Sequence, residues 1–365
     1  MSAQEISPEP RFEKWIPLAR QVVERTLGLR WKDVLDIYSY IPTIPVAEAL
    51  ALEARRAGSD THIELMTDDL WFTSMAELSE RWLREPSPAS LAINRVSTAH
   101  VYLGGPTDAR RMSTIPPEKF DANAMGGMRQ DAPLRARRVK YVDLPIGRVC
   151  PERAEAYGLD YARWRESYEA ALTVDLGEIQ RIGQEQARKL TGRKHVRVTS
   201  DSGTDFRLET KAITPFVDDG IIDSRDVARN HLATSLPAGK VTAAVVPNSA
   251  DGEVRFAEPI FRTGRSIRGV HFTFKKGKLV NWEAEENGDL LNHPLRIAAK
   301  AGSDRMGWFS VGLNSVAKPC MLDNSMVKDD VAIGLGYHQQ LEPSKKPTTA
   351  EFEASIGLCH LDIGD

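Results

Sequence analysis

The sequence predicts a chain of two unlike parts, an N-terminal α/β part built on a parallel sheet and a strand-rich C-terminal part. A strand–helix–strand pattern fills residues 33–66, and parallel neighbours need such a crossover. A long helical stretch covers residues 161–190, and beyond Gly192 apolar and polar residues alternate as in half-buried strands. We therefore expect an N-terminal α/β domain over residues 1–190 and a strand-rich C-terminal domain over residues 191–365.

The N-terminal elements follow the order that a parallel sheet requires. Gly58 fits the left-handed residue that ends many helices, and Gly104-Gly105 fits a turn after a strand. In chain order we expect a helix over 15–27, a strand over 33–38, a helix over 45–57 and strands over 62–66, 99–103 and 139–145.

The C-terminal part is expected to consist of hairpins. The helical stretch before it should break near Val174 and Asp175, where β-branched and short polar residues disfavour a helix. Residues 201–205 are turn formers between two alternating segments, and Lys276-Gly277 is a second such turn. The strands expected are 194–200, 206–209, 240–246, 254–256, 269–275 and 278–285.

Composition excludes several classes of protein. The chain has 365 residues, 41% hydrophobic and 27% charged, with a formal net charge of −3. Charges of both signs are mixed along it, so no nucleic-acid or membrane partner is expected. No apolar run is long enough for a membrane span, and no secretory signal opens the chain. Cys150, Cys320 and Cys359 have no metal-binding spacing, so we predict free thiols and a cytoplasmic protein.

Four motifs in the C-terminal part carry a family resemblance. They are Leu-Pro-Ala-Gly-Lys at 236–240, Pro-Asn-Ser-Ala-Asp-Gly-Glu-Val at 247–254, an alternating hairpin at 272–285 and Cys-His-Leu-Asp at 359–362. Their order and spacing resemble the M29 (aminopeptidase T) superfamily of metallopeptidases over residues 140–365, and more loosely over 33–66. The resemblance implies the M29 fold and a homodimer.

Three metal-ligand positions of those peptidases carry other residues in this chain. By the resemblance, two glutamates are replaced by Lys240 and Trp308, and a histidine is replaced by Asp330. Two metal cations close together need several anionic ligands to offset their mutual repulsion. A lysine in place of such a ligand adds a positive charge that repels both metals. The sequence therefore predicts that this chain is not a two-metal aminopeptidase.

Other ligand positions are kept. Tyr337 stands where the peptidases have a tyrosine, and His360 and Asp362 supply their terminal His-x-Asp pair. At strand spacing both side chains of this pair lie on one face. Imidazole and carboxylate together suit iron, manganese or zinc, and an ordinary His–Asp hydrogen bond is the alternative.

One branch of the superfamily, the 2,5-dihydroxypyridine 5,6-dioxygenases, is nearest in motif. Residues 306–308 resemble its Ile-Gly-Trp, and residues 359–363 resemble its Cys-His-Leu-Asp-Ile. That branch uses one non-haem iron, which implies Fe(II) here, with Mn, Zn or no metal as alternatives. Its first iron histidine falls on Arg305, which stays protonated and cannot bind a metal. The third ligand is expected from one of three residues: His338, His231 or Asp330.

Each candidate residue receives a role. His360 and Asp362 would hold the metal, and Trp308 would stack on the ring of the substrate. Lys240 and Arg305 would bind the substrate's carboxylate or oxyanion. Proton transfer or completion of the metal shell is expected from Tyr337, His338 and Asp330. Each also has an ordinary structural interpretation, as a surface cation, a core aromatic or a residue at a strand end.

The expected function is an enzyme acting on a small aromatic or heteroaromatic acid, most like a mononuclear non-haem iron ring-cleaving dioxygenase. A metal-free hydrolase or lyase that uses Lys240 and Arg305 in place of a metal is the first alternative. A residual one-metal aminopeptidase is the second. A non-catalytic protein that keeps the fold to bind a ligand or a partner chain is the third.

Overall fold

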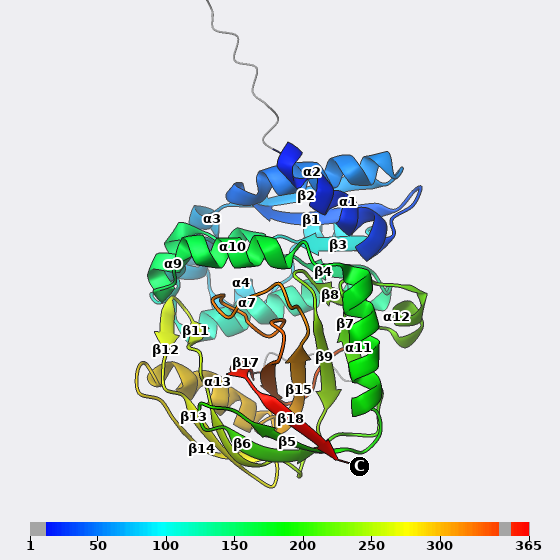
Figure 1. The fold of residues 1–365 in the computed structure, drawn as a ribbon. Coiled ribbons are helices and arrows are strands. Elements are labelled where there is room, and N and C mark those ends of the chain that lie inside the picture. The colour runs from blue at the N-terminus through cyan, green and yellow to red at the C-terminus, as the bar shows by residue number, and fades with distance from the viewer. Residues whose placement is uncertain (1–11, 343–351, 365) are drawn as a thin grey trace, which may run out of the picture.

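The computed structural model describes residues 12–342 and 352–364, and a parallel sheet forms its N-terminal part (Figure 1). The strand order of this sheet is β2-β1-β3-β4-β8. The predicted strand–helix–strand unit is present as β1, α2 (Ile44–Arg56) and β2. The five strands are β1 (Val34–Tyr40), β2 (Asp60–Met66), β3 (Ala99–Tyr102), β4 (Lys140–Asp143) and β8 (Ala233–Ser235).

One face of the parallel sheet is apolar. Alternate residues such as Leu35, Ile37 and Val101 point to it and are fully buried. Ala49 and Leu50 of α2 belong to the same hydrophobic core. The other elements on this side are η1 (Glu13–Trp15), α1 (Ile16–Arg20), η2 (Gln21–Leu27), α9 (Pro151–Tyr157) and α10 (Tyr161–Ala171).

The other face of the parallel sheet is polar and carries Asp36, His62 and His100. Helices between β2 and β4 lie on this side, and Ser90 of one of them contacts Glu64 of β2. These helices are α3 (Asp68–Glu77), α4 (Glu80–Leu83), α5 (Pro88–Asn94), α6 (Ala109–Met112), α7 (Pro117–Gln130) and α8 (Ala132–Ala136).

The predicted break in the long helical stretch is confirmed. Helix α10 ends at Ala171, and α11 (Leu176–Leu190) begins after Asp175. The carboxylate of Asp175 accepts a hydrogen bond from the amide of Gly177 at 2.8 Å, which caps the new helix. Helix α11 then places Ile179 and Leu190 in the C-terminal core.

Two antiparallel sheets form the C-terminal part. The six-stranded sheet has the order β14-β13-β10-β6-β5-β18, and the five-stranded sheet has the order β17-β16-β15-β9-β7. The six strands are β5 (His195–Thr199), β6 (Asp205–Glu209), β10 (Asp251–Arg255), β13 (His271–Lys275), β14 (Lys278–Glu283) and β18 (His360–Gly364). The five strands are β7 (Phe216–Asp218), β9 (Lys240–Ala244), β15 (Met306–Gly312), β16 (Asp330–Leu335) and β17 (Phe352–Leu358).

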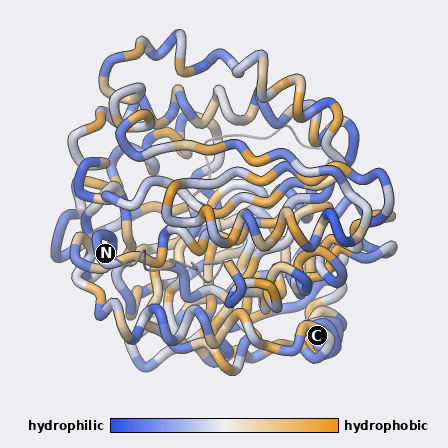
Figure 2. The backbone as a smooth tube through the Cα atoms, turned by 90° about the horizontal axis from the view of Figure 1, so that it is seen from above, coloured by the Kyte–Doolittle hydropathy of each residue, from blue (hydrophilic) through white to orange (hydrophobic). Residues whose placement is uncertain are grey.

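These two sheets share one hydrophobic core. Phe272 of the six-stranded sheet and Phe309 and Phe352 of the five-stranded sheet are buried in it. Figure 2 shows hydrophobic segments gathered in the interior and hydrophilic ones mainly at the periphery. The remaining elements are η3 (Ile41–Thr43), η4 (Ile146–Arg148), α12 (Ser224–Arg229), α13 (Asp289–Lys300) and the ribbon β11 (Ile260–Arg262) with β12 (Arg265–Ile267).

The predicted fold class is confirmed: a parallel α/β part is followed by a strand-rich part, and both predicted hairpins are present. The parallel sheet also takes its last strand, β8, from beyond residue 190. Among the described residues, no helix is long and apolar enough to cross a membrane. Cys150, Cys320 and Cys359 are free thiols, as predicted.

Candidate functional site

The five-stranded sheet has one apolar and one polar face. Its apolar face joins the shared core, because alternate residues such as Val241 and Phe309 point inward. On the other face, Lys240 lies opposite Asp218 of β7 and Gly312 of β15. The polar face is therefore where charged side chains of this sheet meet.

Lys240 is the cation of this face. Its side chain is 15% exposed, and its Nζ lies 3.4 Å from Ser325 Oγ and 3.6 Å from Glu353 Oε1. Burial disfavours the charge on Lys240, but nearby carboxylates outweigh burial and raise its pKa above the ordinary value. These carboxylates belong to Glu353, Asp323 and Asp218. Lys240 therefore stays protonated at neutral pH, so it acts as a fixed positive charge and not as a base.

Small residues line the middle of the polar face. Gly312 lies beside Lys240, and a Cβ at Gly312 would come within 1.9 Å of the carbonyl oxygen of Val327. A Cβ at Gly334 would come within 1.9 Å of the Trp308 ring. The ring of Trp308 thus lies over Gly334, and both close approaches require glycine.

His338 packs against the ring of Trp308. The two rings are 5.0 Å apart between centroids and nearly perpendicular, at 77°. Burial, followed by the charges of Lys240 and His231, lowers the pKa of His338 to about 3. His338 is therefore neutral. Tyr337 precedes it in the half-buried segment after β16.

Three buried polar atoms lie on or near this face without a hydrogen-bond partner among the described residues. They are Thr242 Oγ1, Ser310 Oγ and His338 Nδ1. Thr242 and Ser310 are paired across β9 and β15, in the row next to Lys240. Buried polar atoms of this kind commonly meet an ordered water or a ligand group.

Asp330 is the buried acid of the face. It is fully buried, and the hydroxyl of Ser355 lies 2.7 Å from each of its carboxyl oxygens. Burial raises the pKa of Asp330 to about 8, although the bond from Ser355 opposes the shift. Asp330 is therefore mostly protonated at neutral pH and holds a proton that can be donated.

A hollow of about 210 Å³ opens beside these groups. Glu353 and Ser355 line it, so it touches the partner of Lys240 and the partner of Asp330. More carboxylates than cations surround it, which favours a ligand with a positive group. Its walls include Glu258, Phe261, Leu322, Asp323, Glu353 and Ser355.

Arg305 lies away from Lys240, at the opposite end of the paired strands. Lys240 pairs with Gly312, and Arg305 precedes β15. Strand residues advance about 3.4 Å each, so the positions from Gly312 back to Arg305 span about 24 Å. The Arg305 guanidinium donates to the carbonyl of Lys276 at 2.6 Å. The structure therefore does not bring the two cations together.

His360 and Asp362 share one face, as their spacing predicts, but it is the exposed outer face of the six-stranded sheet. They lie in β18 opposite Thr199 and Arg197, and Leu361 between them turns toward the core. Lys240, Asp330 and Trp308 belong to the five-stranded sheet. The predicted metal pair and the predicted substrate-binding residues thus lie on different sheets.

The residues present do not fit the metal centre that the resemblance implies. Within residues 12–342 and 352–364, no three His, Cys, Asp or Glu side chains are grouped so that they could hold a metal ion. Lys240, which the resemblance assigns to a ligand position of the peptidases, carries a positive charge and forms an ion pair with Glu353.

The partners of Lys240 and Asp330 are Ser325, Glu353 and Ser355, and none of these is predicted as a site residue from the sequence. One signal was available, because Glu353 and Ser355 alternate with apolar residues and so share a strand face. Nothing local in the sequence indicates that this face turns toward Lys240.

Comparisons with known proteins agree with this fold. The family model for thermophilic metalloproteases of the M29 type matches residues 176–363. The structure of wild-type AmpT from Thermus thermophilus is similar, with a TM-score of 0.72 at 18% identity, covering 96% of this chain and 94% of that chain. The structure of 2,5-dihydroxypyridine dioxygenase from Pseudomonas putida KT2440 has a TM-score of 0.53 at 11% identity, covering 96% and 91%. No curated protein matches the chain.

Proposed function

Because this chain belongs to the M29 peptidase family, we propose that it is a hydrolase acting on a small molecule at a metal-independent site around Lys240. The site consists of Lys240, Ser325, Asp330, Glu353 and Ser355, and we call it the Lys240 site. The observation that carries the proposal is the ammonium of Lys240, held between Ser325 and Glu353, and Glu353 lines the hollow.

Lys240 supplies positive charge in this proposal. A fixed ammonium near a reacting carbonyl stabilises the negative charge that develops on its oxygen, which is the task of a metal in a metallopeptidase. The site does not form a Ser–Lys nucleophile pair, because such a pair needs a lysine that gives up its proton. The carboxylates around Lys240 hold its proton in place.

Asp330 supplies the proton for the leaving group. It is fully buried and does not touch the hollow itself, but Ser355 lines the hollow and lies 2.7 Å from Asp330. Water attacks the carbonyl carbon of the substrate and the C–N bond breaks. The leaving nitrogen takes the Asp330 proton through the Ser355 hydroxyl, and the proton released by the water returns to Asp330 by the same route. An acid whose pKa lies near the working pH suits this task.

The charge of the hollow favours a substrate with an amino group. Glu353 is 45% exposed, and Asp323 and Glu258 line the same hollow, so a cationic group is attracted there. Because Lys240 is already paired with Glu353, a substrate carboxylate would have to displace that partner. We therefore propose amide-bond hydrolysis in a small molecule that carries a free amino group.

A mononuclear iron dioxygenase acting on an aromatic acid is the second candidate. The fold similarity to 2,5-dihydroxypyridine dioxygenase and the shared face of His360 and Asp362 favour it. It requires a third ligand beside this pair on the outer face of the six-stranded sheet, since the Lys240 site lies on another sheet.

One experiment separates the two candidates. Protein purified anaerobically without a chelator is analysed for metal by plasma mass spectrometry, and then screened for hydrolysis of amino-acid amides with and without EDTA. Hydrolysis that persists in EDTA and is lost in Lys240→Met supports the proposal. About one iron per chain that disappears in the His360→Ala/Asp362→Ala variant overturns it and supports the dioxygenase.

A further inference from the structure

The strand order of the parallel sheet reverses between β1 and β3. Strand β2 lies on one side of β1, and β3 and β4 lie on the other. In open α/β sheets, ligands bind outside the carboxyl ends of the strands at such a point of reversal. The segment that follows β3, residues 103–107, lies at this point.

Two buried glycines stand in this segment. Gly104 and Gly105 follow Leu103, and neither amide donates a hydrogen bond to a described residue. A Cβ at Gly105 would come within 3.2 Å of the Tyr102 hydroxyl and 4.0 Å of Nη2 of Arg153. Glycine thus keeps the region between the phenol and the guanidinium open. Main-chain amides in glycine-containing turns are common ligands of anions.

Two arginines lie around the same segment. Arg153 of α9 is 5% exposed, and its Nε and Nη2 donate to the carbonyl oxygen of Pro106 at 3.1 and 2.6 Å. Arg148 of η4 is half-buried, and its guanidinium carbon lies 5.7 Å from the centroid of the Tyr102 ring. Within residues 12–342 and 352–364, neither arginine forms an ion pair. A cation removed from water without a counter-charge is costly, so the pair favours an anion.

Both guanidinium groups are charged and repel each other. Burial is the main cause that lowers the pKa of Arg153, and the charge of Arg148 lowers it further. Burial also disfavours the charge of Arg148, but Tyr102 and Asp143 outweigh burial and raise its pKa. A guanidinium keeps its proton in either case, so two cations lie near each other at neutral pH.

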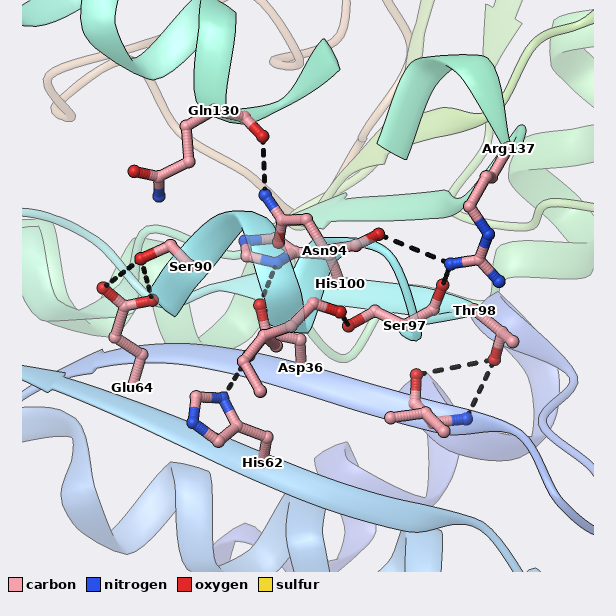
Figure 3. A network of polar contacts seen from close by, with 12 residues as sticks. Asp36, His62, Glu64, Ser90, Asn94, Ser97, Thr98, His100, Gln130 and Arg137 are labelled. Carbon is pink, nitrogen blue, oxygen red and sulfur yellow. Dashed lines mark hydrogen bonds and ion pairs between the residues drawn. The ribbon is translucent and has the colours of Figure 1, made fainter. Parts of the chain in front are cut away.

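The carboxylates on the polar face of the sheet do not pair with these arginines. Oδ1 of Asp36 lies 2.8 Å from Nδ1 of His62, and Oδ2 lies 2.9 Å from Nδ1 of His100 (Figure 3). Asp143 lies beside Tyr102 in the sheet, and its Oδ1 is buried without a hydrogen-bond partner in the described chain. The two guanidinium groups are therefore left without a matching negative charge.

We propose that Arg148, Arg153 and the amides of Gly104 and Gly105 bind the phosphate group of a small molecule. A phosphate group carries up to two negative charges and three acceptor oxygens, which suits two guanidinium groups and two amides. It would remove the repulsion between the arginines, whereas a single carboxylate would match only one of them. The proposal concerns binding and does not depend on hydrolysis at the Lys240 site.

The experiment measures the melting temperature of the full chain in a phosphate-free buffer to which inorganic phosphate is added. Sodium chloride at equal ionic strength corrects for screening of surface charges. A ligand that binds only the folded chain raises its melting temperature, so phosphate is expected to stabilise the unchanged chain beyond sodium chloride. Arg148→Gln is expected to weaken phosphate binding about tenfold or more, because it removes charge-assisted hydrogen bonds.

Arg111→Gln is the matched control. The guanidinium of Arg111 also lies over an aromatic ring, 4.2 Å from the centroid of Phe72, but it is paired with Asp69 at 2.9 Å. Because this cation already has its counter-charge, Arg111→Gln should respond to phosphate as the unchanged chain does.

Gly105→Ala is a second variant, which keeps both arginines and tests the site if Arg148→Gln does not fold. Its methyl group would lie between the Tyr102 hydroxyl and Arg153, where the anion is expected, so phosphate binding should again weaken. Circular dichroism checks the fold of each variant.

Three results would overturn the proposal. The first is an unchanged chain that phosphate stabilises no more than sodium chloride does. The second is equal phosphate binding by the unchanged chain and by the folded variants Arg148→Gln and Gly105→Ala. The third is equal stabilisation by succinate at the same concentration, which would assign the site to carboxylates instead of phosphate.

Discussion

The two C-terminal sheets are built alike but are used differently. Each has an apolar face turned to the shared core and a polar face turned away from it. On the five-stranded sheet, the polar face is covered, and Lys240 and Asp330 have strongly shifted pKa values. On the six-stranded sheet, the polar face is exposed, and His360 and Asp362 lie on it. Alternation along a strand shows which side chains share a face, whereas chemistry depends on what covers that face.

The largest expected effect tests the covered face. Lys240→Met should lower the rate of the proposed hydrolysis by about a hundredfold or more, the usual consequence of removing one charge-stabilising group. The rate constant on amino-acid amides is the measurement. Arg305→Met is the control, because Arg305 lies at the far end of β15 and should leave the rate unchanged. If Lys240→Met and Arg305→Met lowered the hydrolysis rate equally, the Lys240 site would not be where catalysis takes place.

The second effect concerns packing on the same face. Gly334→Ala would place a methyl group within 1.9 Å of the Trp308 ring, and should lower the free energy of unfolding by about 1–3 kcal/mol. Urea denaturation measures this loss. The double variant Gly334→Ala/Trp308→Ala should lose less than the sum of its single variants, because the methyl group then fills part of the cavity. Strictly additive losses would show that the ring does not lie on Gly334.

The third effect is a change in pH dependence. The pKa of Asp330 is about 8 in the folded chain against an ordinary 3.8, so the folded state holds a proton that the unfolded state releases. The contribution of Asp330 to unfolding free energy therefore falls as pH rises from about 4 to 8 and is constant above that. Asp330→Asn should remove this slope and abolish the fall in hydrolysis rate above pH 8. An unchanged rate profile would remove Asp330 from the mechanism.

The smallest effect is expected on the exposed face. His360→Ala and Asp362→Ala should each change the free energy of unfolding by no more than about 0.5 kcal/mol, as is usual for surface positions. Hydrolysis and metal content should also be unaffected. A loss of bound iron in either variant would show that the exposed face of the six-stranded sheet, and not the covered face of the five-stranded sheet, holds the catalytic centre.

The strand–helix–strand unit, the break in the long helical stretch and the two hairpins could be predicted from the sequence, because each carries a local signal. The helix break before Asp175 is an example, since the capping carboxylate lies next to the helix it starts. The family could also be predicted, from motifs whose order survives low identity.

The composition of the site could not be predicted in the same way. The resemblance assigns Arg305 and Lys240 to ligand positions of the family, but strand register places them about 24 Å apart along the sheet. His360 and Asp362 share a face as expected, yet pairing of β18 with β5 turns that face outward. Ser325 and Glu353 meet Lys240 only through contacts distant in sequence. Register and coverage are tertiary properties, which no local pattern encodes.

The position of β8 has a consequence for the order in which the chain folds during synthesis. Tyr141 of β4 pairs with Ala233 of β8, and about 90 residues separate them in the sequence. At a translation rate of roughly 5–20 residues per second, β8 leaves the ribosome about 5–20 s after β4. During that interval the nascent parallel sheet has two open edges, β2 and β4, which is when a chaperone would be of most use to it.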